Sequence, residues 1–216
     1  MKNMNFSHQF NQDIPKPMLT RIPQYLTYLK SLSVDIKYIN SAKIAEALNL
    51  GVVQVRKDLA FISKEGRPKL GYELLTLINK LESFLGYHQI ENTVLVGVGQ
   101  LGSALYNYSG FQEYGLKIIA IFDTPEKIKV SGLPIKAMDK LPDIIKQYQV
   151  QVGMIATTTE AAQEVCNQMV VSGIKGILNF ASLHLVTPAD VIVKNMNIAT
   201  TLSLLVKEIK EKDGRK

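Results

Sequence analysis

The sequence is poor in the residues that build disulfide frameworks and metal sites. Its 216 residues include one cysteine, three histidines and no tryptophan. The single Cys166 cannot form an intramolecular disulfide, and His8, His88 and His184 lack the spacing of metal ligands. These shortages exclude a disulfide-stapled secreted scaffold, give no reason to expect a metal centre and favour a reducing cytoplasm. Cys166 lies within a helical pattern and is expected to be a small buried hydrophobe.

Long apolar runs are also missing. No stretch reaches the roughly 20 apolar residues that a membrane-spanning helix needs. The polar amino terminus, residues 1–17, lacks the apolar core of a secretory signal. The composition, 46% hydrophobic and 20% charged, is ordinary for a soluble protein with a core. We therefore expect a cytoplasmic protein that has no membrane partner.

Positive charge is unevenly distributed along the chain. The formal net charge is +6, and residues 1–90 hold 12 Lys and Arg against 7 Asp and Glu, whereas residues 91–216 hold 13 against 12. The excess therefore belongs to the first part, where a polyanionic partner is expected. A solvated basic surface would explain the charge equally well, so the motifs must decide.

The amino-terminal part has the helical pattern of a DNA-binding module. Apolar residues recur at helical spacing from Ile22 to Leu32. A second helix, capped by Asn40 or Ser41, is broken at Gly51 because glycine turns sharply at little cost. A third helix is predicted over 52–62. Four of its apolar residues are expected to be buried: Val52, Val55, Leu59 and Ile62.

The third helix would carry polar side chains on its outer face. With the apolar residues inward, Gln54, Arg56 and Lys57 point outward, as on a recognition helix in the major groove. Residues 63–72 combine turn residues with cations and fit a wing along the sugar-phosphate backbone. The wing cations are Lys64, Arg67 and Lys69. A purely structural helical cap is the alternative, since two short helices around a glycine are common.

From Glu91 onward, apolar strands alternate with helices, which is typical of a parallel sheet with crossover helices. Strands are expected at 93–96, 116–122, 133–135, 152–156, 176–179 and 191–193. Helices are expected at 101–108, 141–148 and 160–171. The pattern therefore predicts an α/β Rossmann domain in this part of the chain.

The first of these strands leads into the glycine fingerprint of a dinucleotide-binding fold. The fingerprint consists of Gly97, Val98, Gly99, Gln100, Leu101 and Gly102. Gly97 permits a tight turn, Gly99 lets the backbone approach a pyrophosphate, and Gly102 lets the helix pack on the strand. The amides at the helix start favour the anion.

An acid follows 21 residues after the last of these glycines. Asp123 can accept both ribose hydroxyls and would repel a 2′-phosphate, which favours NAD(H) over NADP(H). Another nucleotide or coenzyme A is the alternative ligand for the same fold.

Enzymatic activity fits the sequence less well than binding does. After Val193 only 23 residues remain, too few for a substrate domain, and Tyr114 and Lys117 lack the Tyr-x-x-x-Lys spacing. No acid or base is placed to work beside a nicotinamide. Binding without turnover is therefore expected.

The last part of the chain, residues 195–216, is predicted to be an amphipathic helix. Its apolar face consists of Ile198, Leu202, Leu205 and Ile209. A partner subunit would cover this face, and a dimer suits palindromic DNA. Packing back on its own domain is the alternative. The chain is thus expected to hold a DNA-binding domain at 1–90, a Rossmann domain at 91–194 and a dimerisation helix at 195–216.

Together these residues resemble the Rex family of redox-sensing transcriptional repressors. The likeness runs from about Ile14 to Ile209. Besides the fingerprint, its most specific pieces are residues 19–23, 54–59, 161–165 and 172–181. The resemblance implies a homodimer with winged-helix DNA-binding domains, Rossmann NAD(H) domains and a domain-swapped carboxy-terminal helix. It also implies repression when NADH is scarce and release from DNA when NADH binds.

The resemblance implies roles for further residues. Five are placed in the cofactor site: Tyr108, Thr157, Thr158, Asn179 and Phe180. Arg21, Tyr108 and Asn197 match a switch in which Arg and Tyr pair with a tail Asp. This chain departs from the family pattern at Asn197, at Thr157–Thr158, where Val-Pro is usual, and in the wing, which indicates a divergent member.

We therefore predict a dimeric, NAD(H)-responsive repressor of palindromic operator DNA. One alternative is a transcription factor whose Rossmann domain has lost NADH discrimination and serves dimerisation or binds another nucleotide. A small NAD-dependent oxidoreductase is a poor third.

Overall fold

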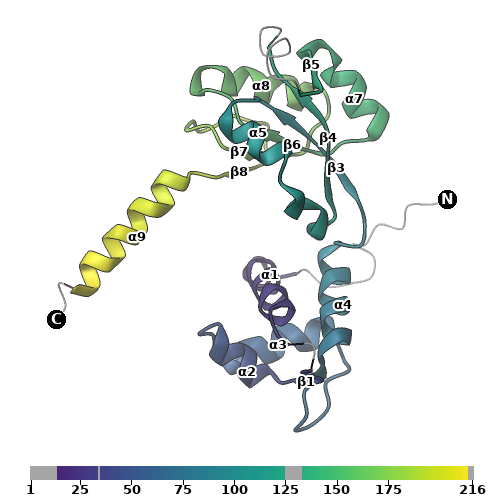
Figure 1. Ribbon diagram of the computed structural model, residues 1–216, viewed down its shortest axis with the longest axis vertical. Helices are drawn as coiled ribbons and strands as arrows, with labels where there is room; N and C mark the ends of the chain where they lie inside the picture. Colours follow the sequence, from purple (N-terminus) through teal and green to yellow (C-terminus); the bar gives the residue numbers. More distant parts are fainter. Residues whose placement is uncertain (1–13, 34, 125–132, 214–216) are drawn as a thin grey trace. The chain divides into compact units, whose positions relative to one another are not determined.

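The computed structural model describes residues 14–33, 35–124 and 133–213. The chain divides into two compact units, Met1–Gln89 and Ile90–Lys216 (Figure 1). This division lies within one residue of the boundary proposed from the sequence between 90 and 91. Among the described helices, none has the length and hydropathy needed to cross a membrane.

The first unit is a helical domain with a small sheet (Figure 1). Its helices are α1 (Lys16–Lys30), α2 (Ser41–Ala47), α3 (Val52–Ile62) and α4 (Leu74–Leu85). Two short strands, β1 (Tyr38–Ile39) and β2 (Tyr72–Glu73), pair antiparallel. The segment between α3 and β2 forms the wing, so the order of elements is that of a winged helix. Helix α4 is not among the predicted elements, and its leucines join α1 and α3 in one core.

Local chemistry explains where α2 and α3 begin. The Asn40 side chain accepts a hydrogen bond from the Lys43 amide at 3.0 Å, which confirms the predicted cap of α2. Helix α3 has the predicted bounds and starts after Gly51. The predicted burial of Val52 is wrong, because 38% of this residue is exposed. It lies in the first turn of α3, and core contact begins one turn later at Val55.

The second unit is built on a six-stranded, wholly parallel sheet with the order β5-β4-β3-β6-β7-β8. Its strands are β3 (Glu91–Val96), β4 (Leu116–Phe122), β5 (Ile135–Lys136), β6 (Val152–Ile155), β7 (Gly176–Asn179) and β8 (Ile192–Asn195). Its helices are α5 (Gln100–Tyr106), η2 (Ser109–Tyr114), η3 (Met138–Lys140), α7 (Leu141–Tyr148), α8 (Thr159–Val171) and α9 (Ile198–Asp213). The predicted α/β class is confirmed, and β4, β7 and α7 have the predicted bounds.

The sheet separates two apolar clusters. Val94 and Val96 of β3 face a cluster that includes residues of α7 and α8, whereas Leu95 faces a cluster with α5 and η2. This alternation follows from the two-residue period of a strand. Helices therefore cover both faces, as in a Rossmann fold (Figure 1). Cys166 is completely buried in the first of these clusters, as predicted.

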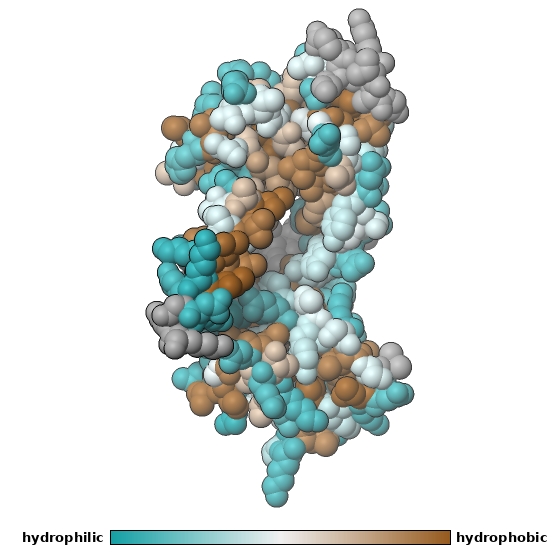
Figure 2. All heavy atoms as spheres, turned by 60° about the vertical axis from the view of Figure 1, so that its left-hand side comes forward, coloured by the Kyte–Doolittle hydropathy of each residue, from teal (hydrophilic) through white to brown (hydrophobic). Residues whose placement is uncertain are grey.

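The last helix, α9, is the least buried element of the second unit. It begins at Ile198 rather than at residue 195, because Asn195 belongs to β8 and Asn197 caps the helix. The Asn197 side chain accepts a hydrogen bond from the Thr200 amide at 2.9 Å. No residue of α9 is buried, and Figure 2 shows apolar side chains gathered along it.

Candidate DNA-binding and nucleotide-binding sites

Helix α3 presents three polar side chains to solvent. Gln54, Arg56 and Lys57 are exposed, while Val55 and Leu59 are completely buried. The predicted outward placement of these three side chains and the burial of Val55 and Leu59 are therefore confirmed, whereas Val52 is exposed and Asp58 is buried. Contact of the outer face with DNA stays a prediction.

The wing is a tight hairpin. The Arg67 amide donates to the Gly71 carbonyl at 2.8 Å, and the Gly71 amide returns a bond to the Arg67 carbonyl at 2.9 Å. Gly71 has φ +88°, and a β-carbon there would collide with the Ile39 carbonyl. The three predicted wing cations, Lys64, Arg67 and Lys69, are all exposed. They are placed where a phosphate backbone could approach them.

Tyr38 is a wing neighbour that sequence reasoning missed. The Arg67 guanidinium lies 5.8 Å from the Tyr38 ring centroid, and its Nη1 donates to the Tyr38 hydroxyl at 3.5 Å. The Lys37 ammonium lies 5.9 Å from the same centroid. This ring thus holds two cations beside the wing. An aromatic in a two-residue strand has no periodic signal that marks such a role.

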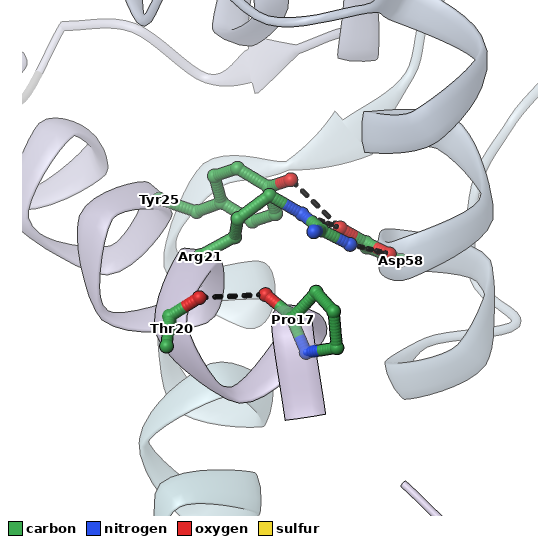
Figure 3. Close-up of polar contacts among 5 residues, drawn as sticks. All are labelled: Pro17, Thr20, Arg21, Tyr25 and Asp58. Atoms are coloured by element: carbon green, nitrogen blue, oxygen red, sulfur yellow. Dashed lines mark hydrogen bonds and ion pairs between the residues drawn. The ribbon is translucent and has the colours of Figure 1, made fainter. Parts of the chain in front are cut away.

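A second feature missed by sequence reasoning lies beneath the recognition face. Arg21 of α1 forms a bidentate ion pair with Asp58 of α3: Nε donates to Oδ2 at 2.8 Å and Nη2 to Oδ1 at 3.0 Å (Figure 3). The Tyr25 hydroxyl also donates to Oδ2 at 2.8 Å. Burial, followed by this bond to Asp58, raises the pKa of Tyr25 to about 12, so the hydroxyl stays a donor at neutral pH.

The nucleotide-binding candidate is a cavity of about 370 Å³ at the carboxyl ends of β3, β4 and β6. At this point the order of strands along the sheet reverses, with β4 on one side of β3 and β6 on the other. Ligands of such folds usually bind at this switch point. Five predicted residues line it: Gly97, Gly99, Asp123, Thr157 and Thr158. Sequence reasoning missed its other lining residues: Val96, Thr124, Met138, Ala156, Ala161 and Val165.

Three fingerprint glycines occupy different surroundings. Gly97 has φ +97°, and a β-carbon there would lie 2.5 Å from the Ala156 carbonyl group. A β-carbon at Gly102 would collide with the Gly97 carbonyl. Gly99, by contrast, has φ −71° and faces open space. The fold therefore requires the first and third glycines, whereas the space beside Gly99 is free for a ligand.

Asp123 is fixed at the end of β4. Its Oδ2 accepts from the Val98 amide at 2.6 Å, and its Oδ1 accepts from the Thr124 amide at 2.7 Å. The acid is thereby tied to the glycine fingerprint and held at the cavity wall. A carboxylate in this place can accept hydroxyl groups from a sugar.

The other predicted cofactor residues lie outside the lining of this cavity. Val98 and Gly102 are buried, whereas Gln100 and Leu101 are exposed at the start of α5. Tyr108 is 58% exposed and meets the Phe111 ring edge-on, with centroids 5.1 Å apart. Their contact with a cofactor stays a prediction.

Asn179 is the last residue of β7, and Phe180 directly follows it. Asn179 is completely buried, and its amide nitrogen donates to the Ala181 and Leu183 carbonyls and to Asn195 Oδ1. Phe180 packs against the apolar cluster beneath the fingerprint. The Asn179 side chain therefore shapes this loop and β8, and any contact with a cofactor stays a prediction.

Arg21, Tyr108 and Asn197 belong to separate parts of the chain. Arg21 lies in the first unit, and the other two lie in the second. The contact that the resemblance implies among them stays a prediction. Among the described residues, no group of His, Cys, Asp or Glu is arranged to hold a metal ion.

Two family models match the two units. Residues 13–60 match a model described as "Putative DNA-binding protein N-terminus", and residues 88–183 match one described as "CoA binding domain". The first agrees with the placement of α1 to α3, and the second covers the cavity and five of the six strands of the sheet, β3 to β7. The second description names coenzyme A, which the sequence left open as an alternative to NAD(H).

Solved structures share the fold over nearly the whole chain. A Rex-family repressor, RSP, in complex with NAD+ and operator DNA has a TM-score of 0.84 and 28% identity, covering 94% of this chain and 95% of that chain. The complex of RSP with NADH has a TM-score of 0.80 over 94% and 97% of the two chains.

Curated relatives are similar over nearly their full length. The redox-sensing transcriptional repressor Rex of Treponema denticola is 36% identical over 199 residues, 90% of this chain and 95% of the relative. That of Bacteroides fragilis is 33% identical over 207 residues, 94% of each. These relatives are transcriptional repressors, not enzymes. The chain belongs to the Rex family of redox-sensing transcriptional repressors.

Proposed function

We propose that the protein represses transcription by binding operator DNA and that it leaves this DNA when NADH occupies the cavity of the second unit. The observation that carries the proposal is that one chain holds two features. One is a helix, α3, with exposed polar side chains, and the other is a cavity at the glycine fingerprint that is lined by Asp123. Solved Rex-family relatives were obtained with NAD+ and operator DNA and with NADH. Gln54, Arg56, Lys57 and the three wing cations would contact the DNA.

The residues of the cavity fit NAD(H). The open space beside Gly99 leaves room for a pyrophosphate, and Asp123 offers a fixed acceptor for ribose hydroxyls. Thr157 and Thr158 add hydroxyl groups on the β6 side. Asp123 would repel a 2′-phosphate, so NAD(H) is favoured over NADP(H). The bound dinucleotide acts as a signal, and no residue of this chain needs to transfer a hydride.

Release from DNA requires NADH to bind one conformation better than another. A ligand with equal affinity for the DNA-binding and DNA-free states shifts nothing. We assign part of this discrimination to Arg21, Tyr108 and Asn197. An acceptor at position 197 would draw the Arg21 guanidinium into one arrangement.

A homodimer in the cytoplasm completes the proposal. The apolar face of α9 is exposed, and Ile198, Leu202, Leu205 and Ile209 each keep about half or more of their surface accessible. A second copy of the chain would cover this face, and its two-fold symmetry would match a palindromic operator.

Calorimetric titration of the purified protein tests the cofactor part of the proposal. NADH, NAD+, NADPH and coenzyme A are titrated separately, the last because residues 88–183 match a CoA binding domain. NADH is expected to bind most tightly. DNA affinity is then measured by fluorescence anisotropy with NAD+ and with NADH. Equal DNA affinity in both conditions would favour the alternative, a transcription factor that has lost NADH discrimination.

A further inference from the structure

The inner face of the recognition helix carries a charge that a purely apolar packing would not need. Asp58 directly follows the exposed Lys57, yet its side chain is only 9% exposed. Arg21 and Tyr25, one turn apart on α1, supply three hydrogen bonds to its carboxylate (Figure 3). The carboxylate is thus held from α1 and has no role at the outer surface.

The geometry of this contact restricts how α3 can lie on α1. A guanidinium and a carboxylate joined by two parallel bonds fix a plane as well as a distance. The Arg21 side chain is 15% exposed, so both charges have lost most of their water. Loss of one partner would leave the other charge poorly solvated, and shifts of α3 that separate the pair are disfavoured.

The same guanidinium reaches the outer face through Gln54. Hydrogen-bond chemistry assigns the Gln54 amide oxygen, not its nitrogen, to the side that faces Arg21, because the other assignment would set N–H groups against N–H groups. In this orientation the oxygen accepts from Nη1 at 2.9 Å and from Nη2 at 3.3 Å. The amide oxygen is therefore engaged. The NH2 group of this exposed residue makes no bond to Arg21 and is left as a donor.

A donor-only glutamine reads bases differently from a free one. Bidentate recognition of adenine needs both the amide oxygen, for the N6 amino group, and the amide nitrogen, for N7. With its oxygen held by Arg21, Gln54 can only donate, to adenine N7, thymine O4 or the two acceptors of guanine, O6 and N7. It loses the second bond that singles out adenine, so guanine, with two acceptors, becomes the better partner.

We propose that Arg21 is a positioning residue for DNA recognition, which fixes α3 through Asp58 and presents Gln54 to the bases as a hydrogen-bond donor. This inference rests on the proposed binding of DNA by α3. It assigns Arg21 and Asp58 a role in the DNA-binding unit itself, in addition to any contact that Arg21 makes elsewhere.

The first test measures operator affinity of Arg21→Ala, Asp58→Ala and the double variant. Asp58→Ala removes a negative charge beside two cations, so long-range electrostatics alone would strengthen DNA binding. The proposal expects binding about tenfold weaker or more for each single variant, and a double variant no weaker than the worse single. Glu46→Gln removes an exposed charge from α2 in the same unit and serves as the control. If Asp58→Ala binds the operator as tightly as this control, the positioning role of the Arg21–Asp58 ion pair is wrong.

Loss of folding is separated from loss of positioning by two milder variants and a second measurement. Tyr25→Phe removes only one hydroxyl, and Arg21→Lys keeps the charge while losing the fork. In both variants, backbone hydrogen exchange measured without DNA should be faster in α3 than in the parent protein, while α4 keeps its protection. An equal increase in exchange across the whole first unit, or unchanged exchange in α3, would contradict a positioning role. This readout does not depend on DNA binding.

The closing experiment tests the glutamine. Operators are selected from a randomised DNA library with the full-length parent protein, Gln54→Ala and Arg21→Lys. The parent should prefer guanine, which offers two acceptors, at one position of each half-site. Gln54→Ala should lose that preference, and Arg21→Lys should shift it toward adenine. An unchanged preference in Arg21→Lys would overturn the donor-only assignment. Failure of the parent protein to select any sequence would instead overturn the proposed function.

Discussion

Asp123 joins the wall of the candidate cavity to the glycine fingerprint. Its two oxygens accept from backbone amides of two segments, Val98 after β3 and Thr124 after β4. The side chain is therefore oriented by the fold before any ligand arrives, and its remaining lone pairs are free for hydroxyl groups. The spacing in the sequence predicted this acid at the end of the strand, but it did not predict the bond to the Val98 amide.

Asp123→Ala should weaken NADH binding and narrow the gap between NADH and NADPH. A hydrogen bond to a charged group is worth roughly 1.5–3 kcal/mol, so a loss of about tenfold or more is expected. NADPH should lose less, because the repulsion of its 2′-phosphate disappears. Calorimetry measures both affinities, with Asp143→Asn, an exposed acid on α7, as the control. If the parent protein binds NADPH as tightly as NADH, the role of Asp123 is wrong.

Gly97 and Gly99 provide a matched pair of single-methyl variants. Gly97→Ala should lower the melting temperature of the second unit, because its φ of +97° and the nearby Ala156 carbonyl oppose a side chain. A cost of more than about 1 kcal/mol is expected. Gly99→Ala should fold normally but bind NADH at least about tenfold less tightly. Equal NADH affinity in Gly99→Ala and the parent protein would show that no ligand approaches this backbone.

Single-residue roles were predictable only where one residue type has one use. Glycines and an acid at fixed spacing identified the cofactor side. Asp58 gave no such signal, because its partner Arg21 is 37 residues away and a charged helix residue is usually exposed. Met138, Ala161 and Val165 line the cavity only because distant segments meet there.

At the scale of elements, periodicity predicted what repeats and missed what does not. The apolar spacing of α3 gave its bounds, and the alternation of strands and helices gave the Rossmann sheet. Strands β1 and β2 have two residues each, too few for a period. Helix α4 was not predicted, although its leucines have a helical spacing.

The outer face of α3 should carry much of the DNA affinity. Replacing Arg56 and Lys57 together with Ala should weaken operator binding by several kcal/mol, at roughly 1–3 kcal/mol per base-reading side chain. The slope of log affinity against log salt should flatten by about 0.9 for each phosphate that the variant no longer neutralises.

Lys117→Ala with Lys146→Ala is the matched control, because it removes the same charge from exposed positions of the second unit. Anisotropy at several salt concentrations measures both pairs. A folded Arg56 and Lys57 variant with the DNA affinity of this control would contradict the recognition-helix assignment.

At the scale of the whole molecule, the exposed face of α9 is the strongest sign of a second subunit. Leu202→Asp with Leu205→Asp places two charges on this face and should convert a dimer into monomers. Light scattering with size-exclusion chromatography measures the mass. Thr200→Asp adds a charge on the opposite side of the helix and should leave the dimer intact. A monomeric parent protein would contradict the proposed dimer directly.

The response to NADH should depend on the residue that caps α9. Asn197 accepts from the Thr200 amide and could offer Arg21 only a neutral hydrogen bond. Asn197→Asp has the same shape and can keep the cap with one oxygen, while its charge strengthens the bond to a guanidinium. The ratio of DNA affinities measured with NAD+ and with NADH should therefore grow by about fivefold, the lower end of typical coupling between sites. Asn197→Ser keeps a capping oxygen without charge and should not enlarge the ratio. An equal ratio in Asn197→Asp and the parent protein would remove position 197 from the switch.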